Sequence, residues 1–308
     1  MKAVICTRYG PPEVLQLAET PKPSPKDNEI LIKIHATTVA AGDVRIRRFD
    51  VPPLEWIPAR LFLGIFRPKR NILGMEVAGE VEETGKDVKS LKPKDKVFAF
   101  AGFGFGAYAE YICLPENGKP PMEGLVAKMP SNLSCEEAAA IPIGGLAALN
   151  LLRKGNVEPG MKVMVYGASG SVGTYAVQLA AHFGASVTAV CGPWNLELVK
   201  SLGASRAMDY TTGELEDDQE RYGLVFDAVG KLSGSAFKRA LLPGGKFVSV
   251  EMDRKDSVED LAHLSQLAEM GEIKPVIDKT YALDQIAEAH EYVQKGHKKG
   301  NVVIRVSE

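Results

Sequence analysis

The sequence feature that most constrains the fold is a strand, a glycine-rich turn and a helix in direct succession. Residues 163–166 read Val-Met-Val-Tyr, a run typical of a buried strand, and glycines follow at spacing three before a helical stretch. Such glycines permit a tight turn and the close approach of a pyrophosphate, whose charge meets the N–H groups of the helix N-terminus. The alternative is a turn that only packs a helix on a sheet. The order predicts a dinucleotide-binding turn formed by Gly167, Ala168, Ser169, Gly170, Ser171, Val172 and Gly173.

The pattern around this turn predicts two domains. Before residue 110, short β-branched runs are separated by prolines and glycines, which indicates a compact, barrel-like β-rich domain. After Gly160, apolar strands alternate with helices, which predicts a Rossmann-type, doubly wound parallel sheet and therefore an α/β protein. A capping-box spacing from Ser134 to Glu137 predicts a helix start. We expect the β-rich domain to span 1–125 and the Rossmann domain 126–271, and the tail 272–308 to rejoin the first sheet.

The composition excludes several partners. Lys and Arg number 37 against 39 Asp and Glu, so the net charge of −2 favours neither nucleic acid nor a membrane surface. The four cysteines are far apart, which argues against a disulfide framework, and residues 1–8 lack the apolar core of a signal peptide. The apolar stretch 54–66 is interrupted by Pro58 and Arg60 and predicts a loop with a short helix. A cytoplasmic location is expected.

The end of the second Rossmann strand indicates which dinucleotide binds. An acid at this position accepts hydrogen bonds from the ribose hydroxyl of NADH and repels the 2′-phosphate of NADPH. Residues 190–195 read Val-Cys-Gly-Pro-Trp-Asn, without an acid. This favours NADPH, although NADH stays possible because no arginine stands there either. The expected neighbours of the adenosine end are Cys191, Gly192, Asn195 and Tyr210, and Lys200 is equally well explained as part of a solvated helix face.

Four segments carry a resemblance to a known family. They are the opening 1–4 with Tyr-Gly-Pro-Pro-Glu-Val-Leu at 9–15, Leu-Gly-Met-Glu-Val-Ala-Gly-Glu-Val at 73–81, the turn 166–173, and Ala-His at 289–290 with 296–303. The chain resembles the medium-chain dehydrogenase/reductase superfamily, in its zinc-independent quinone oxidoreductase branch. The resemblance implies a GroES-like catalytic domain, an active site against the Rossmann domain and a homodimer. It also implies that Ala228, Val229 and Val250, at the ends of the fourth and fifth strands, line the cofactor groove.

The zinc ligands of metal-dependent relatives are missing from this sequence. Those relatives place a cysteine in the segment that here reads Ala-Ala-Gly-Asp at 40–43, and a histidine where Met75 stands. The spacing of a structural four-cysteine site is also missing, so a tetrahedral zinc site is not expected. Glu76 remains and is interpreted as a structural carboxylate.

The catalytic candidates are Asp43 and Arg45, which are the polar residues left in the segment that resembles the family's catalytic loop. A structural cap or a salt bridge explains either residue equally well. The asparagine, tyrosine and threonine that relatives often carry are missing, so we expect water to deliver the proton. His290 and His297 are assigned to packing and solvation.

These observations predict zinc-independent, NADPH-dependent hydride transfer to a quinone or an α,β-unsaturated carbonyl, a small electrophilic substrate. The cofactor carries the chemistry, so the protein has to supply mainly binding and orientation. Two alternatives stay open. One is a metal-free alcohol or aldehyde oxidoreductase, and the other is a non-catalytic NADPH-binding protein.

Overall fold

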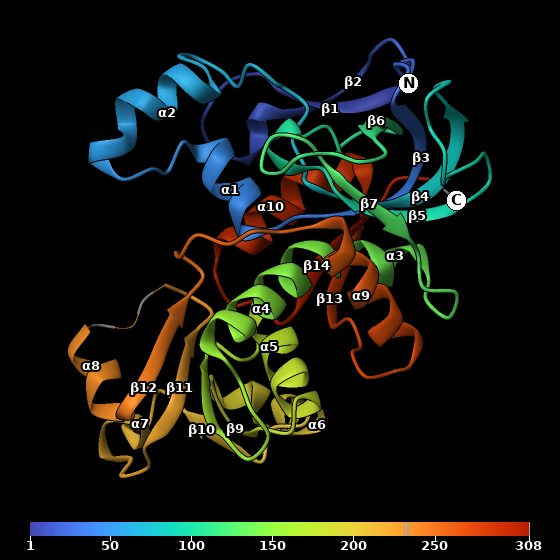
Figure 1. The fold of residues 1–308 in the computed structure, drawn as a ribbon. Helices are drawn as coiled ribbons and strands as arrows, with labels where there is room; N and C mark the ends of the chain where they lie inside the picture. Colours follow the sequence, from blue (N-terminus) through green and yellow to red (C-terminus); the bar gives the residue numbers. More distant parts are fainter. Residues whose placement is uncertain (231, 233, 308) are drawn as a thin grey trace. The chain divides into compact units, whose positions relative to one another are not determined.

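A computed structural model describes residues 1–230, 232 and 234–307 of the chain (Figure 1). Contacts divide the chain into two compact units. The first unit comprises Met1–Pro142, Ser257–Ser265 and Ile277–Glu308, and the second comprises Ile143–Asp256 and Gln266–Val276. These units are defined by contacts alone, and the domain limits 1–125 with 272–308 and 126–271 stay a prediction.

The first unit is β-rich. Its strands are β1 (Lys2–Cys6), β2 (Leu15–Glu19), β3 (Glu29–Thr38), β4 (Glu76–Thr84), β5 (Lys96–Phe100), β6 (Tyr111–Pro115), β7 (Leu125–Lys128), β13 (Ile277–Ala282) and β14 (Asn301–Arg305). Seven of them form one sheet in the order β13-β14-β3-β4-β5-β7, with β6 also paired to β3, while β1 and β2 form a separate hairpin. The tail strand β14 pairs antiparallel with β3, which confirms that the C-terminal segment rejoins the first sheet.

The first unit also contains helices. They are α1 (Ala41–Arg48), α2 (Trp56–Leu63), α3 (Cys135–Ala139) and α10 (Ile286–Gln294), with short 3₁₀ turns η1 (Pro12–Val14), η2 (Pro53–Glu55), η3 (Gly102–Gly104) and η5 (Leu283–Gln285). The predicted capping box is confirmed at α3, where Glu137 N–H donates to the Ser134 hydroxyl and the Ser134 N–H donates to the Glu137 carboxylate. A short helix within 54–66 is also confirmed. Within the described residues, no helix is both long and apolar enough to cross a membrane.

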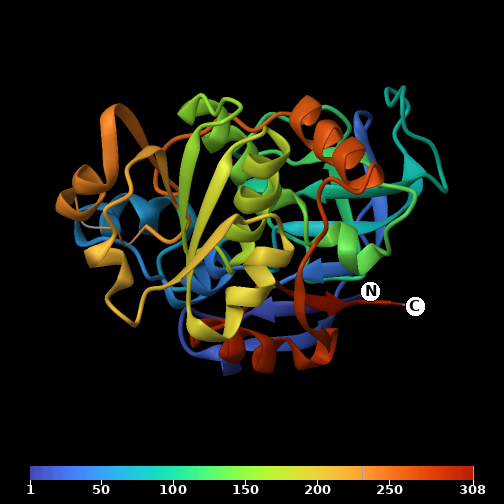
Figure 2. The ribbon, with the colours of Figure 1, turned by 90° about the horizontal axis from the view of Figure 1, so that it is seen from below.

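The second unit is a doubly wound α/β fold. Its strands are β8 (Lys162–Tyr166), β9 (Ser186–Cys191), β10 (Arg206–Asp209), β11 (Tyr222–Asp227) and β12 (Leu241–Ser249), and its helical segments are α4 (Pro142–Gly155), α5 (Ser171–His182), η4 (Pro193–Asn195), α6 (Leu196–Ser201), α7 (Glu214–Asp217), α8 (Gly234–Ala240) and the end of α9 (Val258–Glu269). All strand pairs are parallel in the order β10-β9-β8-β11-β12. Figure 2 shows helices on both sides of these strands. The predicted Rossmann fold is confirmed, and its strand order reverses between β8 and β11, where such sheets bind ligands.

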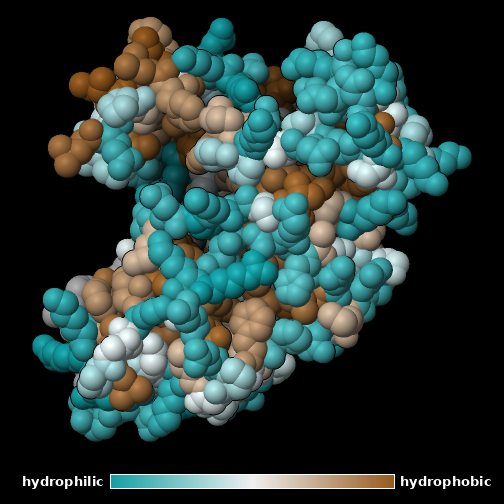
Figure 3. Space-filling model, in the orientation of Figure 1, coloured by the Kyte–Doolittle hydropathy of each residue, from teal (hydrophilic) through white to brown (hydrophobic). Residues whose placement is uncertain are grey.

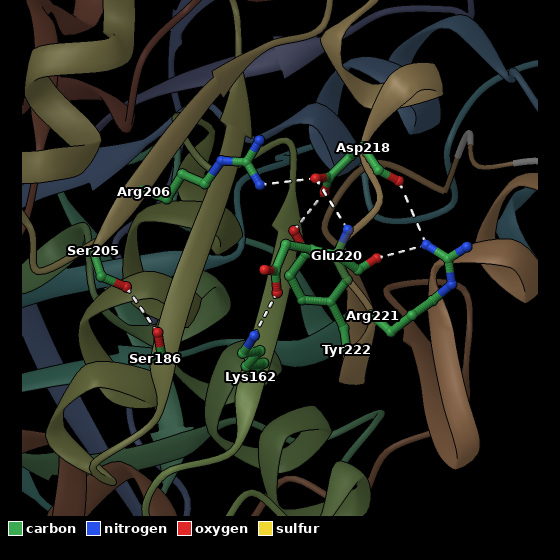
Figure 4. Close-up of polar contacts among 8 residues, drawn as sticks. All are labelled: Lys162, Ser186, Ser205, Arg206, Asp218, Glu220, Arg221 and Tyr222. Carbon is green, nitrogen blue, oxygen red and sulfur yellow. Dashed lines mark hydrogen bonds and ion pairs between the residues drawn. The ribbon is translucent and has the colours of Figure 1, made fainter.

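Polar contacts join the strands near their amino ends (Figure 4). Asp218 accepts from Arg206 at 2.8 Å and from the Tyr222 hydroxyl at 2.7 Å. Lys162 pairs with Glu220 at 2.5 Å. The interactions fix the loop that precedes β11 to the start of β8 and β10. The carboxyl ends of the strands, at the opposite edge of the sheet, carry the glycine-rich turn.

Candidate functional site

The glycine-rich turn connects β8 to α5 and is tightly packed at two of its three glycines. Gly167 has a φ of +76°, and a Cβ there would come within 2.2 Å of Val229 Cγ2. A Cβ at Gly173 would come within 2.1 Å of the Gly167 carbonyl oxygen. Gly167 is therefore required for the turn and its contact with the end of β11, and Gly173 for the close packing of α5 on β8.

The third glycine leaves room for a Cβ. A Cβ at Gly170 would meet only the Gly167 carbonyl oxygen, at 3.4 Å. Gly170 is also the N-cap of α5, where it supplies no side chain to the first helical N–H groups. A helix N-terminus without a side-chain cap, beside an opening at the cap residue, suits the pyrophosphate of a dinucleotide. The residues of the turn therefore fit the cofactor predicted from the sequence.

The end of β9 lies beside this turn. The Asn195 side-chain amide donates to the Ser169 hydroxyl at 3.3 Å, so the structure brings two of the predicted cofactor residues together. Gly192 and Tyr210 are also neighbours, because a Cβ at Gly192 would lie 3.6 Å from the Tyr210 hydroxyl. Cys191 is buried, and burial followed by the charge of Asp209 raises its pKa to about 11. Its thiol is neutral at physiological pH.

Asp209, at the end of β10, is a neighbour of this region that the sequence analysis missed. Its Cα pairs with that of Cys191 across the parallel strands. One carboxylate oxygen, Oδ1, accepts from the Thr211 N–H and from the Thr211 hydroxyl, both at 2.8 Å. These hydrogen bonds hold the charge within the turn after β10. The signal was available in the sequence, because the carboxyl ends of neighbouring parallel strands lie at the same edge of a sheet.

The ends of β11 and β12 complete the carboxyl edge of the sheet. Asp227 is buried, and its Oδ1 accepts from the N–H groups of Val229 and Gly230, both at 2.9 Å. The Asp227 carbonyl accepts from the N–H of Val250 at 3.1 Å, which joins the end of β12 to that of β11. Ala228 and Val229 thus form the wall of the turn on the Gly167 side.

Asp43, in the first unit, is buried at the N-terminus of α1. Its Oδ2 accepts from the Ala40 N–H at 2.9 Å, which is the contact of a helix cap. The Tyr108 hydroxyl and the Gly74 backbone lie close to the carboxyl group. Desolvation raises the pKa of Asp43 to about 7, and these hydrogen-bonding neighbours only partly oppose the rise.

Arg45, the second catalytic candidate, is exposed, whereas Arg47 on the same helix is fully buried. Arg47 lies one turn after Asp43, so the two share a buried face, and Arg45 points away from it. Arg47 Nε donates to His290 Nδ1 at 3.3 Å, and Arg47 Nη2 donates to the Gln294 side chain at 2.9 Å. The sequence analysis missed Arg47, because its partners His290 and Gln294 lie more than 240 residues later in the chain.

The positions that correspond to the zinc ligands of relatives are filled by other groups. Met75 is buried. Its terminal methyl lies against Gly42, where a Cβ would be 3.0 Å from it. Glu76 is buried and accepts a short hydrogen bond from the Thr38 hydroxyl. A thioether methyl and a hydrogen-bonded carboxylate do not make a tetrahedral N/S site. In the part of the chain that the structure describes, no three His, Cys, Asp or Glu residues are grouped to hold a metal ion.

The predicted site residues thus form two groups. The turn, the end of β9, Tyr210 and the ends of β11 and β12 gather at the carboxyl edge of the sheet in the second unit. Asp43 and Arg45 belong to α1 in the first unit.

Three family matches cover most of the chain. Residues 26–124 match the alcohol dehydrogenase GroES-like domain, and residues 171–274 and 252–304 match two families that are both described as zinc-binding dehydrogenase. These matches agree with the β-rich first unit and the parallel sheet of the second.

Similar proteins include several reductases. The chain is 34% identical to 2-methylene-furan-3-one reductase of Solanum lycopersicum, over 99% of this chain and 79% of the relative. It is 33% identical to the chloroplastic quinone-oxidoreductase QR1 of Triphysaria versicolor, over 99% and 98%, and 30% identical to the chloroplastic NADPH-dependent alkenal/one oxidoreductase of Arabidopsis thaliana, over 99% and 79%. The solved quinone oxidoreductase of Coxiella burnetii superposes with a TM-score of 0.84 at 27% identity, covering 100% of this chain and 99% of that one.

Proposed function

Because the chain belongs to the medium-chain dehydrogenase/reductase superfamily, we propose that it is a zinc-independent, NADPH-dependent reductase of quinones or α,β-unsaturated carbonyls. Relatives named for the reduction of quinones, of alkenals and enones, and of a methylene-furanone support this substrate class. All three substrate types place an electron-poor carbon in conjugation with a carbonyl group, and such a carbon accepts hydride.

The observation that carries the proposal is the opening at Gly170 beside the N-terminus of α5. In a turn that served only packing, neighbouring atoms would crowd the cap residue Gly170 as closely as they crowd Gly167 and Gly173. The proposed cofactor contacts are the turn itself together with Cys191, Gly192, Asn195, Tyr210, Ala228, Val229 and Val250. When bound, the nicotinamide supplies the hydride, and these residues hold and orient the dinucleotide.

The preference for NADPH over NADH rests on the end of β9. Residues 191–195 present no carboxylate there, and the side-chain amide of Asn195 and the hydroxyl of Tyr210 are hydrogen-bond donors suited to a phosphate. The nearby carboxylate of Asp209 is held by Thr211 within its own turn. A relative named as NADPH-dependent gives the same preference.

The proposed reaction needs no metal. Residues 40–43 contain no cysteine and Met75 stands in place of the histidine of a zinc site, and Met75 packs toward Gly42. Catalysis then relies on holding the acceptor against the cofactor. We propose that solvent delivers the proton, and that Asp43 positions α1 through its hydrogen bond from Ala40. A homodimer and a cytoplasmic location stay predictions from the sequence.

Turnover with a substrate panel tests this function. The panel contains a naphthoquinone, an acyclic enone, an alkenal, a saturated aldehyde and a primary alcohol, each with NADPH or, for the alcohol, NADP⁺. The proposal expects turnover of the first three compounds and little of the last two. Preferential turnover of the saturated aldehyde and the alcohol would favour a metal-free alcohol or aldehyde oxidoreductase. Tight NADPH binding without turnover of any compound would favour a non-catalytic protein.

A further inference from the structure

The helix α2 and its flanking loops expose an unusual number of large apolar side chains. Neither η2 nor α2 contains a buried residue, and Leu54 and Phe66 are 96% and 85% exposed. Figure 3 shows brown, apolar surface gathered over α2. We define the apolar platform as the exposed residues Leu54, Ile57, Leu61, Phe62, Ile65, Phe66 and Phe103. Contiguous exposed apolar surface of this kind marks an interaction site.

A charged side chain, Arg60, holds α2 against other residues of the first unit. The Arg60 guanidinium lies 3.8 Å from the centre of the Phe49 ring and 4.8 Å from those of Tyr9 and Trp56. The Tyr9 hydroxyl also donates to the Gly64 carbonyl at 3.0 Å. An amphipathic helix normally buries its apolar side chains and exposes its charges. In α2 this polarity is reversed, so the apolar side chains are held outward.

The platform extends beyond α2 and has a basic border. Phe62 packs edge-on against Phe103 of η3, with ring centroids 6.2 Å apart. Directly after the platform come Arg67, Lys69 and Arg70, all exposed. Between residues 54 and 70 these three and Arg60 are opposed by a single acid, Glu55. The border of the platform is therefore locally positive, although the net charge of the whole chain is −2.

We propose that the apolar platform and its basic border bind the surface of an anionic lipid bilayer. Apolar side chains on a short helix insert at the boundary of headgroups and acyl chains, and neighbouring Lys and Arg are attracted to anionic headgroups. Figure 1 shows α2 at the periphery of the first unit, as a projecting element. The net charge of the chain predicted no membrane partner, but it averages over the whole chain and does not describe this face. The proposal is independent of the proposed reductase activity.

Vesicle sedimentation tests the proposal without cofactor or substrate. The full chain is mixed with phosphatidylcholine vesicles that contain either no phosphatidylglycerol or about a third of it. We expect binding to the anionic vesicles that weakens as salt is raised. Arg67→Gln with Lys69→Gln and Arg70→Gln should weaken it by about fivefold for each charge removed. Leu54→Ser with Phe66→Ser should weaken it at least as much, because apolar insertion is lost.

Met270→Ser is the matched control, because Met270 is 64% exposed and lies in the second unit, outside the platform. It should bind vesicles like the unaltered chain, and thermal melting of every variant should report an intact fold. Absence of binding to anionic vesicles, or binding that both platform variants retain, overturns the proposal. It is also overturned if the unaltered chain is a dimer and Leu54→Ser with Phe66→Ser makes it a monomer, because a second copy then covers the platform.

Discussion

Arg47 Nε donates a hydrogen bond to His290 Nδ1 at 3.3 Å, and this contact fixes the protonation state of a buried histidine. An accepting ring nitrogen carries no proton, so the His290 ring is neutral with its proton on Nε2. That nitrogen lies 3.1 Å from the Tyr108 hydroxyl, which can then donate toward Asp43 beside it. Burial, and then the charge of Arg47, lower the pKa of His290 to about 3, which agrees with a neutral ring. The four residues form one directed chain of donors.

The first prediction concerns this chain. Arg47→Met should lower the free energy of unfolding by about 1–3 kcal/mol, because it leaves the buried His290 Nδ1 without its donor and also removes the hydrogen bonds to Gly10 and Gln294. Arg45→Met on the exposed face of the same helix is the control and should change it by less than about 0.5 kcal/mol. Urea unfolding measures both variants. Equal losses of unfolding free energy in the two variants would contradict a stabilising role for the buried contacts of Arg47.

The second prediction is a pH dependence of stability. Burial raises the pKa of Asp43 to about 7 in the fold, above its unfolded value, so folding favours the protonated form. The contribution of Asp43 to the free energy of unfolding is complete below about pH 4 and is lost as the pH rises to about 7. Subtracting the unfolding free energy of Asp43→Asn removes the other titrating groups. The difference should fall between pH 4.5 and 7 by at most about 1.4 kcal/mol per pH unit. A flat or rising difference would contradict the raised pKa.

The third prediction separates the glycines of the turn. Gly170→Asp should abolish NADPH-induced stabilisation and leave the melting temperature of the free protein nearly unchanged, because its side chain enters open space and its charge repels the pyrophosphate. Gly173→Ala should instead lower the melting temperature of the free protein, since its Cβ would meet backbone at 2.1 Å. Thermal melting with and without NADPH measures both effects. If Gly170→Asp kept the full NADPH-induced shift, the cofactor would have to bind elsewhere.

The fourth prediction concerns the proton. If water protonates the product and Asp43 only positions α1, Asp43→Asn should reduce kcat/KM by less than the roughly 10²–10⁴-fold of a lost general acid. Steady-state rates across pH measure this. The competing mechanism has protonated Asp43 as the donor, and the rate of the unaltered enzyme would then fall as the pH rises through about 7. Two results together would contradict protonation by water. They are such a fall in the rate of the unaltered enzyme, and an Asp43→Asn variant that is nearly inactive and shows no such fall.

The sequence predicted the elements whose residues carry a local signal. The strand, turn and helix around Gly167 depend on glycine spacing and apolar periodicity, and the capping box at Ser134 depends on two side chains three residues apart. The return of the tail to the first sheet also followed from its β-branched run, since β14 pairs with β3. Each of these features is determined by a few neighbouring residues, so the sequence alone was sufficient.

Features that depend on distant contacts could not be predicted. The burial of Arg47 results from contacts with α10, more than 240 residues later in the chain. The outward orientation of the α2 side chains depends on the rings of Tyr9 and Phe49 around Arg60. In both cases the residue type suggests a solvated charge, and only tertiary packing shows that the charge is enclosed.

Isotope transfer tests the central claim most directly. An acyclic enone is reduced in ordinary water with NADPH that carries deuterium at the transferred position, and the product is analysed by mass spectrometry and NMR. The account predicts one deuterium at the β-carbon of the product and a solvent-derived hydrogen at the α-carbon. It also predicts that unlabelled NADPH in heavy water gives the opposite pattern. A product without deuterium from the cofactor, or no product although NADPH binds at the turn, would contradict the account.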